Sequence, residues 1–240
     1  MAQSTKSSIK RRVALANRIA YLEGLHEEFG NEFSGHISVR YDENKVIMPG
    51  HLHDFGRGLK DITISDIIVV DLEGKVLEGK REPVDEVVLH TSIYKSRPEI
   101  NSVLHLHSPA SVALASTDAT ILPISMRASY FAEGVPVLER DPGVIDNEEI
   151  AAEMVRVLGN HNALLHKGHG VVTVGRNLEE ACILGLYLEG AARNQILAMQ
   201  LGALRPFTKE DALRFARSRS LDKKTAIWKY YENKWARGKS

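Results

Sequence analysis

The chain has 240 residues, of which 43% are hydrophobic and 26% are charged, the balance of an ordinary globular protein. Its 31 Lys and Arg residues equal its 31 Asp and Glu residues, so no overall field is available to hold nucleic acid or an anionic membrane. No apolar run of about 18 residues is present, and the polar residues 1–9 lack the apolar core of a signal peptide. Because the single Cys182 cannot form an internal disulfide, we expect a cytoplasmic enzyme.

Hydrophobic periodicity predicts a single domain over residues 1–240, with a helical tail from about residue 202. Helices are expected over about 7–29, 83–95 with Pro83 in the first turn, a short segment capped by Ser108, 147–158, 178–201 capped by Asn177, and 209–235 as one or two helices. Strands are expected at 36–40, 45–48, 67–71, 76–77, 102–107, 121–125, 135–138, 163–166 and 171–174. Hairpins flanked by helices at both ends indicate a mostly antiparallel sheet covered by helical layers.

The segment His105-Leu106-His107 is the first candidate for a metal site. Side chains alternate between the two faces of a strand, so residues two apart point to the same side. Two imidazoles can then reach one ion while Leu106 faces the core. Such a pair alone is also common as two polar residues at a strand end, so the prediction depends on further ligands.

Those further ligands are offered by two other segments. In His166-Lys167-Gly168-His169-Gly170, the glycines around His169 free the backbone to turn between two apolar strands. His166 is the alternative ligand there. Glu86, near a helix N-terminus, can be a fourth ligand or a general acid/base. Three imidazoles with an open or carboxylate-filled position are typical of a catalytic metal site.

Four motifs occur in order along the chain: Gly35-His36-Ile37-Ser38-Val39-Arg40, Glu86 with His90, Val103-Leu104-His105-Leu106-His107-Ser108-Pro109, and His169-Gly170-Val171-Val172 with Gly175 and Leu178-Glu179-Glu180-Ala181. From about Arg12 to about Leu201 the chain thereby resembles the class II aldolase/adducin family, which contains fuculose-phosphate and ribulose-phosphate aldolases and epimerases. The resemblance implies an α/β fold, a three-layer α/β/α sandwich around a mixed, largely antiparallel sheet. It also implies a zinc-type site on His105, His107 and His169, a catalytic Glu86, and a C4 homotetramer with active sites between subunits.

The chain departs from the sugar-phosphate aldolases at three places where those enzymes hold the phosphate. They have a Gly-Asn pair where this chain has Gly35-His36, and a Thr-Pro-Ser-Gly-like turn where it has Met48-Pro49-Gly50-His51. Their Ser-Ser pair before the glutamate is replaced by Val84-Asp85. Asp85 would repel a phosphate dianion, and Val84 has no side-chain donor. These changes argue against a phosphorylated sugar as the substrate.

In their place stand groups suited to a planar acid. His36, His51 and His53 offer donors, Arg127 can bind a carboxylate through two parallel hydrogen bonds, and Tyr130 is a further candidate proton donor. This pattern is similar to the decarboxylase branch of the family, which acts on hydroxylated aromatic or pyridine dicarboxylates. The alternatives are that Arg127 is a surface ion-pair residue and that His51 and His53 are exposed loop residues.

We therefore predict a metal-dependent carbon–carbon lyase that decarboxylates a hydroxylated aromatic or pyridine carboxylate without oxidation. A divalent ion would stabilise the charge left as carbon dioxide departs, and Glu86 would deliver a proton to carbon. Zinc is the expected ion, with manganese, iron or cobalt as alternatives. The expected partners are a small carboxylate substrate and further copies of the chain.

Three other functions stay open. A retro-aldol lyase or epimerase, acting on a hydroxy-keto sugar or sugar acid with or without phosphate, would use the same electron sink. An iron-dependent oxygenase would use the open positions of a histidine-rich site. A non-catalytic module like the head domain of adducin would lack the metal ligands, and the presence here of Glu86 with all three histidines argues against it.

Overall fold

The computed structural model describes residues 5–26, 34–52, 57–140, 143–219, 221 and 225–236. Its α-helices in the described residues are α1 (Lys6–Leu22), α2 (Val87–Ser96), α3 (Pro109–Ala115), α4 (Glu148–Leu158), α5 (Leu178–Leu201), α6 (Lys209–Ser218) and α7 (Thr225–Ala236). Its strands are β1 (His36–Asp42), β2 (Lys45–Pro49), β3 (Ile67–Asp71), β4 (Val76–Glu78), β5 (Ser102–Leu106), β6 (Val137–Leu138), β7 (Ala163–His166) and β8 (Gly170–Gly175).

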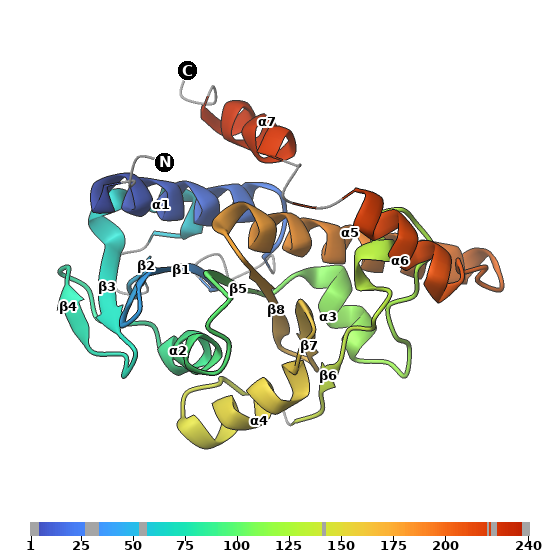
Figure 1. The fold of residues 1–240 in the computed structure, drawn as a ribbon, viewed down its shortest axis with the longest axis horizontal. Coiled ribbons are helices and arrows are strands. Elements are labelled where there is room, and N and C mark those ends of the chain that lie inside the picture. Colours follow the sequence, from blue (N-terminus) through green and yellow to red (C-terminus); the bar gives the residue numbers. More distant parts are fainter. Residues whose placement is uncertain are drawn as a thin grey trace.

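The strands form one eight-stranded sheet in the order β4-β3-β2-β1-β5-β8-β7-β6. Every neighbouring pair is antiparallel except β6 and β7, which are parallel. Helices α1 and α5 cover one face of the sheet, and α2 and α4 cover the other (Figure 1). The expected three-layer α/β/α sandwich around a mixed, largely antiparallel sheet is confirmed.

Alternation along the strands divides the apolar side chains into two cores, one on each face of the sheet. On β5, Leu104 and Leu106 pack in the core under α1 and α5, whereas Val103 packs in the core under α2 and α4. His105 follows Val103 on the α2/α4 face, at the point where the apolar side chains of that face give way to polar ones. The candidate site therefore lies at the edge of a packed core, on the α2/α4 side.

The first helix is shorter than the periodicity predicts, because Gly24 ends it. Gly24 has φ +76°, and its N–H donates to the carbonyl of Tyr21 while the N–H of Leu25 donates to that of Ala20. These two bonds form a Schellman motif, which leaves the helix no route to continue. The prediction of a helix is therefore wrong for residues 23–26. Residues 27–33 lie outside the described part of the chain.

The second helix begins at Val87 instead of Pro83. Pro83 forms an isolated antiparallel bridge with Gly50, and His51 N–H donates to the carbonyl of Glu82. This tertiary pairing holds the chain extended up to the turn that precedes α2. Glu86 becomes the N-cap residue of α2, with its carboxylate free to reach the sheet.

Ser108 occupies the N-cap position of α3, but its side chain makes no capping bond. The buried carboxylate of Glu189 on α5 instead accepts hydrogen bonds from the N–H groups of Ala110 and Ser111. A carboxylate at a helix N-terminus satisfies the unpaired donors and interacts favourably with the helix dipole. The capping group of α3 thus comes from a distant helix.

Residues 121–125 form no strand, contrary to the prediction. The Leu122 N–H donates to the side-chain carbonyl of Gln195, whose amide donates in turn to the carbonyl of Thr120. The carbonyl of Pro123 accepts from the N–H of Phe207. A side chain from α5 and a later loop therefore take the bonds that a neighbouring strand would make.

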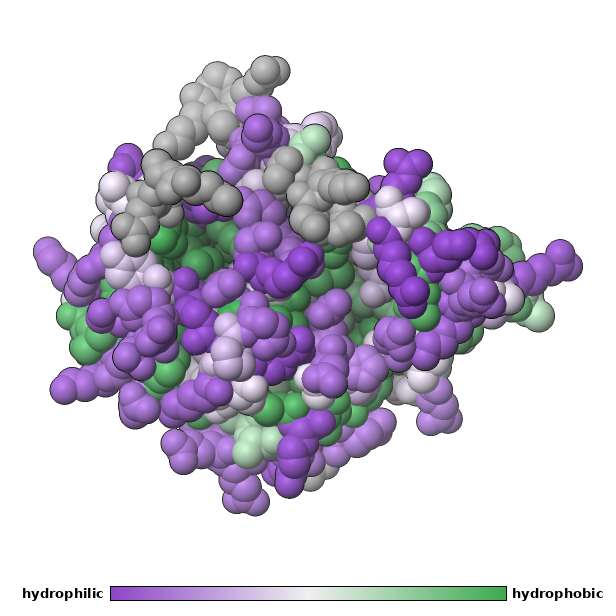
Figure 2. Space-filling view, in the orientation of Figure 1, coloured by the Kyte–Doolittle hydropathy of each residue, from purple (hydrophilic) through white to green (hydrophobic). Residues whose placement is uncertain are grey.

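The described helices include none that is long and apolar enough to cross a membrane. The face drawn in Figure 2 is mostly hydrophilic, with apolar residues showing between the polar ones. Cys182 is buried on α5, where burial raises the pKa of its thiol, as expected for an unreactive core cysteine.

Candidate metal centre

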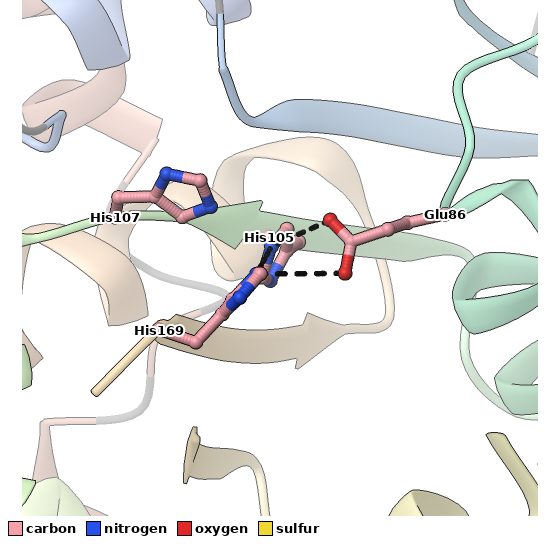
Figure 3. Close-up of side chains that lie close together, drawn as sticks. All are labelled: Glu86, His105, His107 and His169. Carbon is pink, nitrogen blue, oxygen red and sulfur yellow. Dashed lines mark hydrogen bonds and ion pairs between the residues drawn. The ribbon is translucent and has the colours of Figure 1, made fainter. Parts of the chain in front are cut away.

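Four side chains from three separate segments meet at one end of β5. His105 lies near the end of β5, His107 follows that strand, His169 directly precedes β8, and Glu86 begins α2. In Figure 3, dashed lines join Glu86, His105 and His169 to one another, and the ring of His107 lies beside them. One ligand atom from each residue lies within 4.8 Å of all the others.

The spacing of the ligand atoms of Glu86, His105 and His169 fits a small divalent ion. His105 Nε2 lies 3.0 Å from Glu86 Oε2 and 3.2 Å from His169 Nε2, and His169 Nε2 lies 3.5 Å from Glu86 Oε1. Metal–ligand bonds of about 2.0–2.1 Å in a tetrahedral arrangement place ligand atoms roughly 3.3 Å apart. Three imidazoles and one carboxylate are also a common donor set for such ions.

The orientation of His105 is fixed by the backbone. Its Nδ1 lies 3.1 Å from the carbonyl oxygen of Val171, and because a carbonyl can only accept, Nδ1 carries the hydrogen. In the neutral ring the lone pair is then on Nε2, which faces both Glu86 and His169. That arrangement is stable only with a positive charge among these atoms, either a proton or a metal ion.

Glu86 is buried but ionised. Burial alone would raise its pKa, but the neighbouring imidazoles of His105, His169 and His36 outweigh burial and hold the pKa well below its usual range. Glu86 Oε1 also accepts the N–H of Ile145, 2.9 Å away. Glu86 therefore rests as a carboxylate, able to bind a cation or to accept a proton.

The glycines beside His169 serve two different purposes. Gly168 has φ +65°, a conformation that favours glycine. Gly170 leaves room for the ligands, because a Cβ there would lie 2.9 Å from His107 Cδ2 and 3.0 Å from His105 Cε1. The expected freedom to turn applies to Gly168, and close packing explains Gly170.

A pocket of about 100 Å³ opens over Glu86, His107 and His169. The segments where the chain departs from the sugar-phosphate aldolases all line it, through Gly35-His36, Pro49-Gly50-His51 and Val84-Asp85. A larger cavity of about 710 Å³, lined partly by Arg140, His166 and Lys167, adjoins it at Val144. The three sequence segments thus converge on one space beside Glu86, His107 and His169.

His36 and His51 both line this pocket, whereas the other candidate substrate groups lie elsewhere. Arg127 is exposed beside Tyr187 of α5, and the Tyr130 hydroxyl donates to the carbonyl of Arg219 at 2.5 Å. The structure does not bring these two residues to the cluster within one chain, because the short 3-10 helix that carries them (Ala128–Phe131, with Arg127 at its N-cap) packs on α5 and α6. His53 lies outside the described residues.

His166 is not part of the cluster. Its ring stacks on that of His169 with centroids 4.8 Å apart, and burial lowers its pKa to about 4. Burial likewise lowers the pKa of His107, to about 2, so that both rings are neutral at pH 7. A neutral imidazole is the form that binds a metal ion.

The sequence alone did not single out Ser38 and Tyr94. Both are buried, and they continue a line of hydrogen bonds that begins at His36 and passes through His90. The spacing of Glu86, His90 and Tyr94, four residues apart, is the signal that could have indicated them, because such residues share one face of a helix.

Comparison with known proteins gives consistent results. Residues 11–196 match the family model described as Class II Aldolase and Adducin N-terminal domain. The 3,4-dihydroxyphthalate decarboxylase of Arthrobacter keyseri is 32% identical over 198 residues, which are 78% of this chain and 77% of that protein. The L-fuculose phosphate aldolase of Methanococcus vannielii is 30% identical over 166 residues, which are 69% of this chain and 85% of that protein.

Solved structures agree in fold. An aldolase II superfamily protein from Pseudomonas syringae superposes with a TM-score of 0.82 at 22% identity, covering 98% of this chain and 94% of that one. The match to the family model spans most of the sequence and includes all four residues of the cluster. The chain belongs to the class II aldolase and adducin family.

Proposed function

We propose that this protein is a metal-dependent decarboxylase of a hydroxylated aromatic or pyridine carboxylate. Decarboxylases and aldolases of the family are both carbon–carbon lyases, so the proposal concerns which bond is cleaved and in which substrate. Identity to the two 3,4-dihydroxyphthalate decarboxylases, 32% in each case, supports an aromatic acid.

The observation that carries the proposal is the lining of the pocket beside the cluster. Each of the three places where sugar-phosphate aldolases hold phosphate contributes to this lining, and none offers a comparable phosphate ligand here. Asp85 would repel a dianion, and Val84 presents only an apolar surface. His36 and His51 offer imidazole donors that suit a carboxylate.

A divalent ion held by His105, His107 and His169 would act as a Lewis acid and stabilise negative charge on the substrate oxygen. The residues of the chain do the rest. His36 and His51 orient the substrate acid within the pocket. Glu86, resting as a carboxylate, accepts the proton of the substrate hydroxyl and returns it to the ring carbon. The carbon–carboxylate bond breaks, carbon dioxide leaves, and its electron pair remains with the ring as the product phenolate.

In this proposal, Arg127 and Tyr130 contact substrate only when several copies of the chain are assembled. If active sites lie between subunits of a homotetramer, these residues would meet a site of a neighbouring copy. Zinc is the ion that we propose first, because the three imidazoles and the carboxylate match its preferred donors, and manganese, iron and cobalt use similar sets.

The test is to incubate metal-loaded protein with ortho-hydroxylated aromatic and pyridine carboxylates and to measure carbon dioxide release. We expect carbon dioxide and the corresponding phenol in equal amounts, with activity lost in Glu86→Gln at unchanged fold. Hydroxy-keto sugar acids and fuculose phosphate form the parallel arm. Aldehyde products from that arm alone would overturn the decarboxylase and favour a retro-aldol lyase.

A further inference from the structure

A row of polar side chains runs from the candidate metal centre into the interface between β1 and α2. On β1, His36, Ser38 and Arg40 are two residues apart, and from the start of α2, Glu86, His90 and Tyr94 are four apart. Two residues of a strand advance about 6.6 Å and four residues of a helix about 6.0 Å. Because these steps are nearly equal, side chains of the strand and the helix alternate along the row.

The contacts along this row are short and continuous. His36 Nδ1 lies 2.7 Å from His90 Nε2, His90 Nδ1 lies 2.7 Å from Ser38 Oγ, and Ser38 Oγ lies 2.7 Å from the Tyr94 hydroxyl. At the near end, His36 Nε2 lies 3.6 Å from Glu86 Oε2. Ser38 and His90 are fully buried, and Tyr94 is 1% exposed. At the far end, Arg40 donates to the carbonyl of Tyr94 at 2.7 Å.

Each of the four groups from His36 to Tyr94 has only one hydrogen to donate along the row, so these hydrogens must all point the same way. Burial lowers the pKa of His90 well below its usual value and raises that of Tyr94, so both are neutral. In one direction, Tyr94 donates to Ser38, Ser38 to His90 Nδ1, and His90 Nε2–H to His36 Nδ1. In the other direction every bond is reversed.

The near end of the row selects between the two directions. In the reversed arrangement, His36 would carry its hydrogen on Nδ1 and present the lone pair of Nε2 to the carboxylate of Glu86, which is repulsive. In the first arrangement, His36 presents Nε2–H to that carboxylate and to the pocket that it lines. The first arrangement therefore has the lower energy.

We propose that Ser38, His90 and Tyr94 are positioning residues that hold His36 as a fixed hydrogen-bond donor, with its hydrogen on Nε2. A donor held in one tautomer and one orientation binds a carboxylate without first reorganising. Only the identification of that ligand as a substrate carboxylate rests on the proposed function. The tautomer assignment does not depend on that function.

The tautomers can be observed directly in a neutron crystal structure of the deuterated protein. We expect exchanged deuterium on Nε2 and none on Nδ1 in both His36 and His90. Deuterium on Nδ1 of His36 would overturn the proposal. This measurement requires no turnover, so its outcome is separate from that of the decarboxylase assay.

The positioning role can be separated from a packing role with two substitutions of His90. In His90→Gln, the side-chain carbonyl can accept from Ser38 and the amide can donate to His36, whereas His90→Leu fills a similar volume and makes neither bond. For His90→Leu we expect a rise in KM for the aromatic acid and a loss of kcat/KM of about 10- to 100-fold, as for other supporting groups of metal sites. His90→Gln should recover most of this loss, and metal content should stay the same in both.

Thr91→Val is the matched control, because Thr91 is buried next to His90 and its hydroxyl donates to the carbonyl of Val88 within α2, away from the row. It should leave KM and kcat unchanged. If His90→Gln and His90→Leu lose the same kcat/KM, the row has a packing role only and the proposal is wrong. If no aromatic acid is converted by the wild type, the decarboxylase assignment fails, and the neutron structure still decides the tautomers.

Discussion

At the scale of single residues, the candidate centre is organised as much by the backbone as by its four side chains. The carbonyl of Val171 determines which nitrogen of His105 faces the cluster, and the N–H of Ile145 holds one oxygen of Glu86. Gly170 keeps the space that the imidazoles fill. His105 and Glu86 thus each have a backbone partner outside the cluster that limits their orientation, which is how metal sites hold their geometry.

Replacing His107 by Asn should remove one of the three imidazole ligands. We expect metal affinity to fall by more than the roughly 10- to 100-fold that changes in supporting groups cost, with a matching loss of activity. The bound metal per chain can be measured by atomic absorption after dialysis. His161→Asn, a change at a histidine that bonds the carbonyl of Gly134 elsewhere, should retain full metal content. Equal metal content in the two variants would contradict the assigned ligand.

Gly170→Ala should impair the site without changing any ligand. Its Cβ would lie 2.8 Å from the Leu106 carbonyl oxygen and within 3.0 Å of both neighbouring imidazoles, so these rings must shift. We expect at least a tenfold loss of metal affinity, measured by competition with a chelator. Gly190→Ala is the control, since its Cβ would meet only Arg127 Nη1, at an ordinary 3.7 Å. An unchanged metal affinity in Gly170→Ala would show that the two imidazoles can accommodate the added Cβ, and would contradict this role of Gly170.

At the scale of elements, most helices and strands could be predicted from the sequence. The spacing of apolar residues that identifies them depends only on neighbouring residues in the chain. The bounds of β3, β7 and α5 match the sequence prediction residue for residue. Two failures have distant causes: Gln195 bonds residues 121–125, where a strand is predicted, and Gly50 holds Pro83 extended. The overlong first helix has a local cause, because Gly24 ends it. The His105 and His107 pair was predictable because strand alternation fixes their face. The Ser38–His90–Tyr94 row was not, because it exists only once α2 docks on β1.

The buried Asp66 joins the segment before β3 to the segment after β4. Its carboxylate accepts hydrogen bonds from Arg57 at 2.8 Å, from Arg81, and from the N–H of Thr63 at 2.8 Å. Burial would raise its pKa, but these bonds lower it to about 2. Because the folded pKa lies below the unfolded value of about 3.9, the resulting stability is present above pH 4 and is lost as the pH falls towards 2.

Asp66→Asn should therefore lower the free energy of unfolding at pH 7 by about 3–5 kcal/mol, since it removes the buried carboxylate that both Arg57 and Arg81 bind. The wild type should lose about 2 kcal/mol more than the variant between pH 5 and pH 2, as expected from the shift in pKa. Urea denaturation at the two pH values measures both effects. Asp118→Asn, at an exposed position, is the control. Parallel pH dependence in wild type and Asp66→Asn would contradict this role.

At the scale of the whole molecule, we expect exposed apolar side chains to mediate contacts between copies of the chain. Large hydrophobic side chains are exposed around the C-terminal end of α5 and the loop that follows it, at Leu197, Met199, Leu201 and Phe207. Leu197 and Leu201 are four residues apart on α5, so they share one face of the helix and form an exposed apolar patch. Such patches mark interaction surfaces more often than isolated hydrophobic residues do. The positions of the exposed Arg127 and the half-buried Tyr130, away from the cluster of their own chain, also fit a site shared between copies.

We expect light scattering to give a mass four times the 26.7 kDa of the chain. The double substitution Leu197→Glu and Leu201→Glu should reduce that mass, because it places charges in the apolar patch. Leu77→Glu, at an exposed leucine on β4, should leave the mass unchanged. A wild-type mass equal to one chain would rule out the tetramer.

The pairing of β1 with β5 places His36 directly opposite His105, and Ile37 opposite Leu104. A deletion of one residue near the start of β1 would exchange its two faces, turning isoleucine and valine towards α2 and the polar row towards α1. The irregularity in β1 falls between Arg40 and Asp42, just beyond the last member of that row. We therefore expect the fold to tolerate insertions and deletions after Arg40 but not between His36 and Arg40. The length of this short strand is then constrained as strictly as the identity of its histidine.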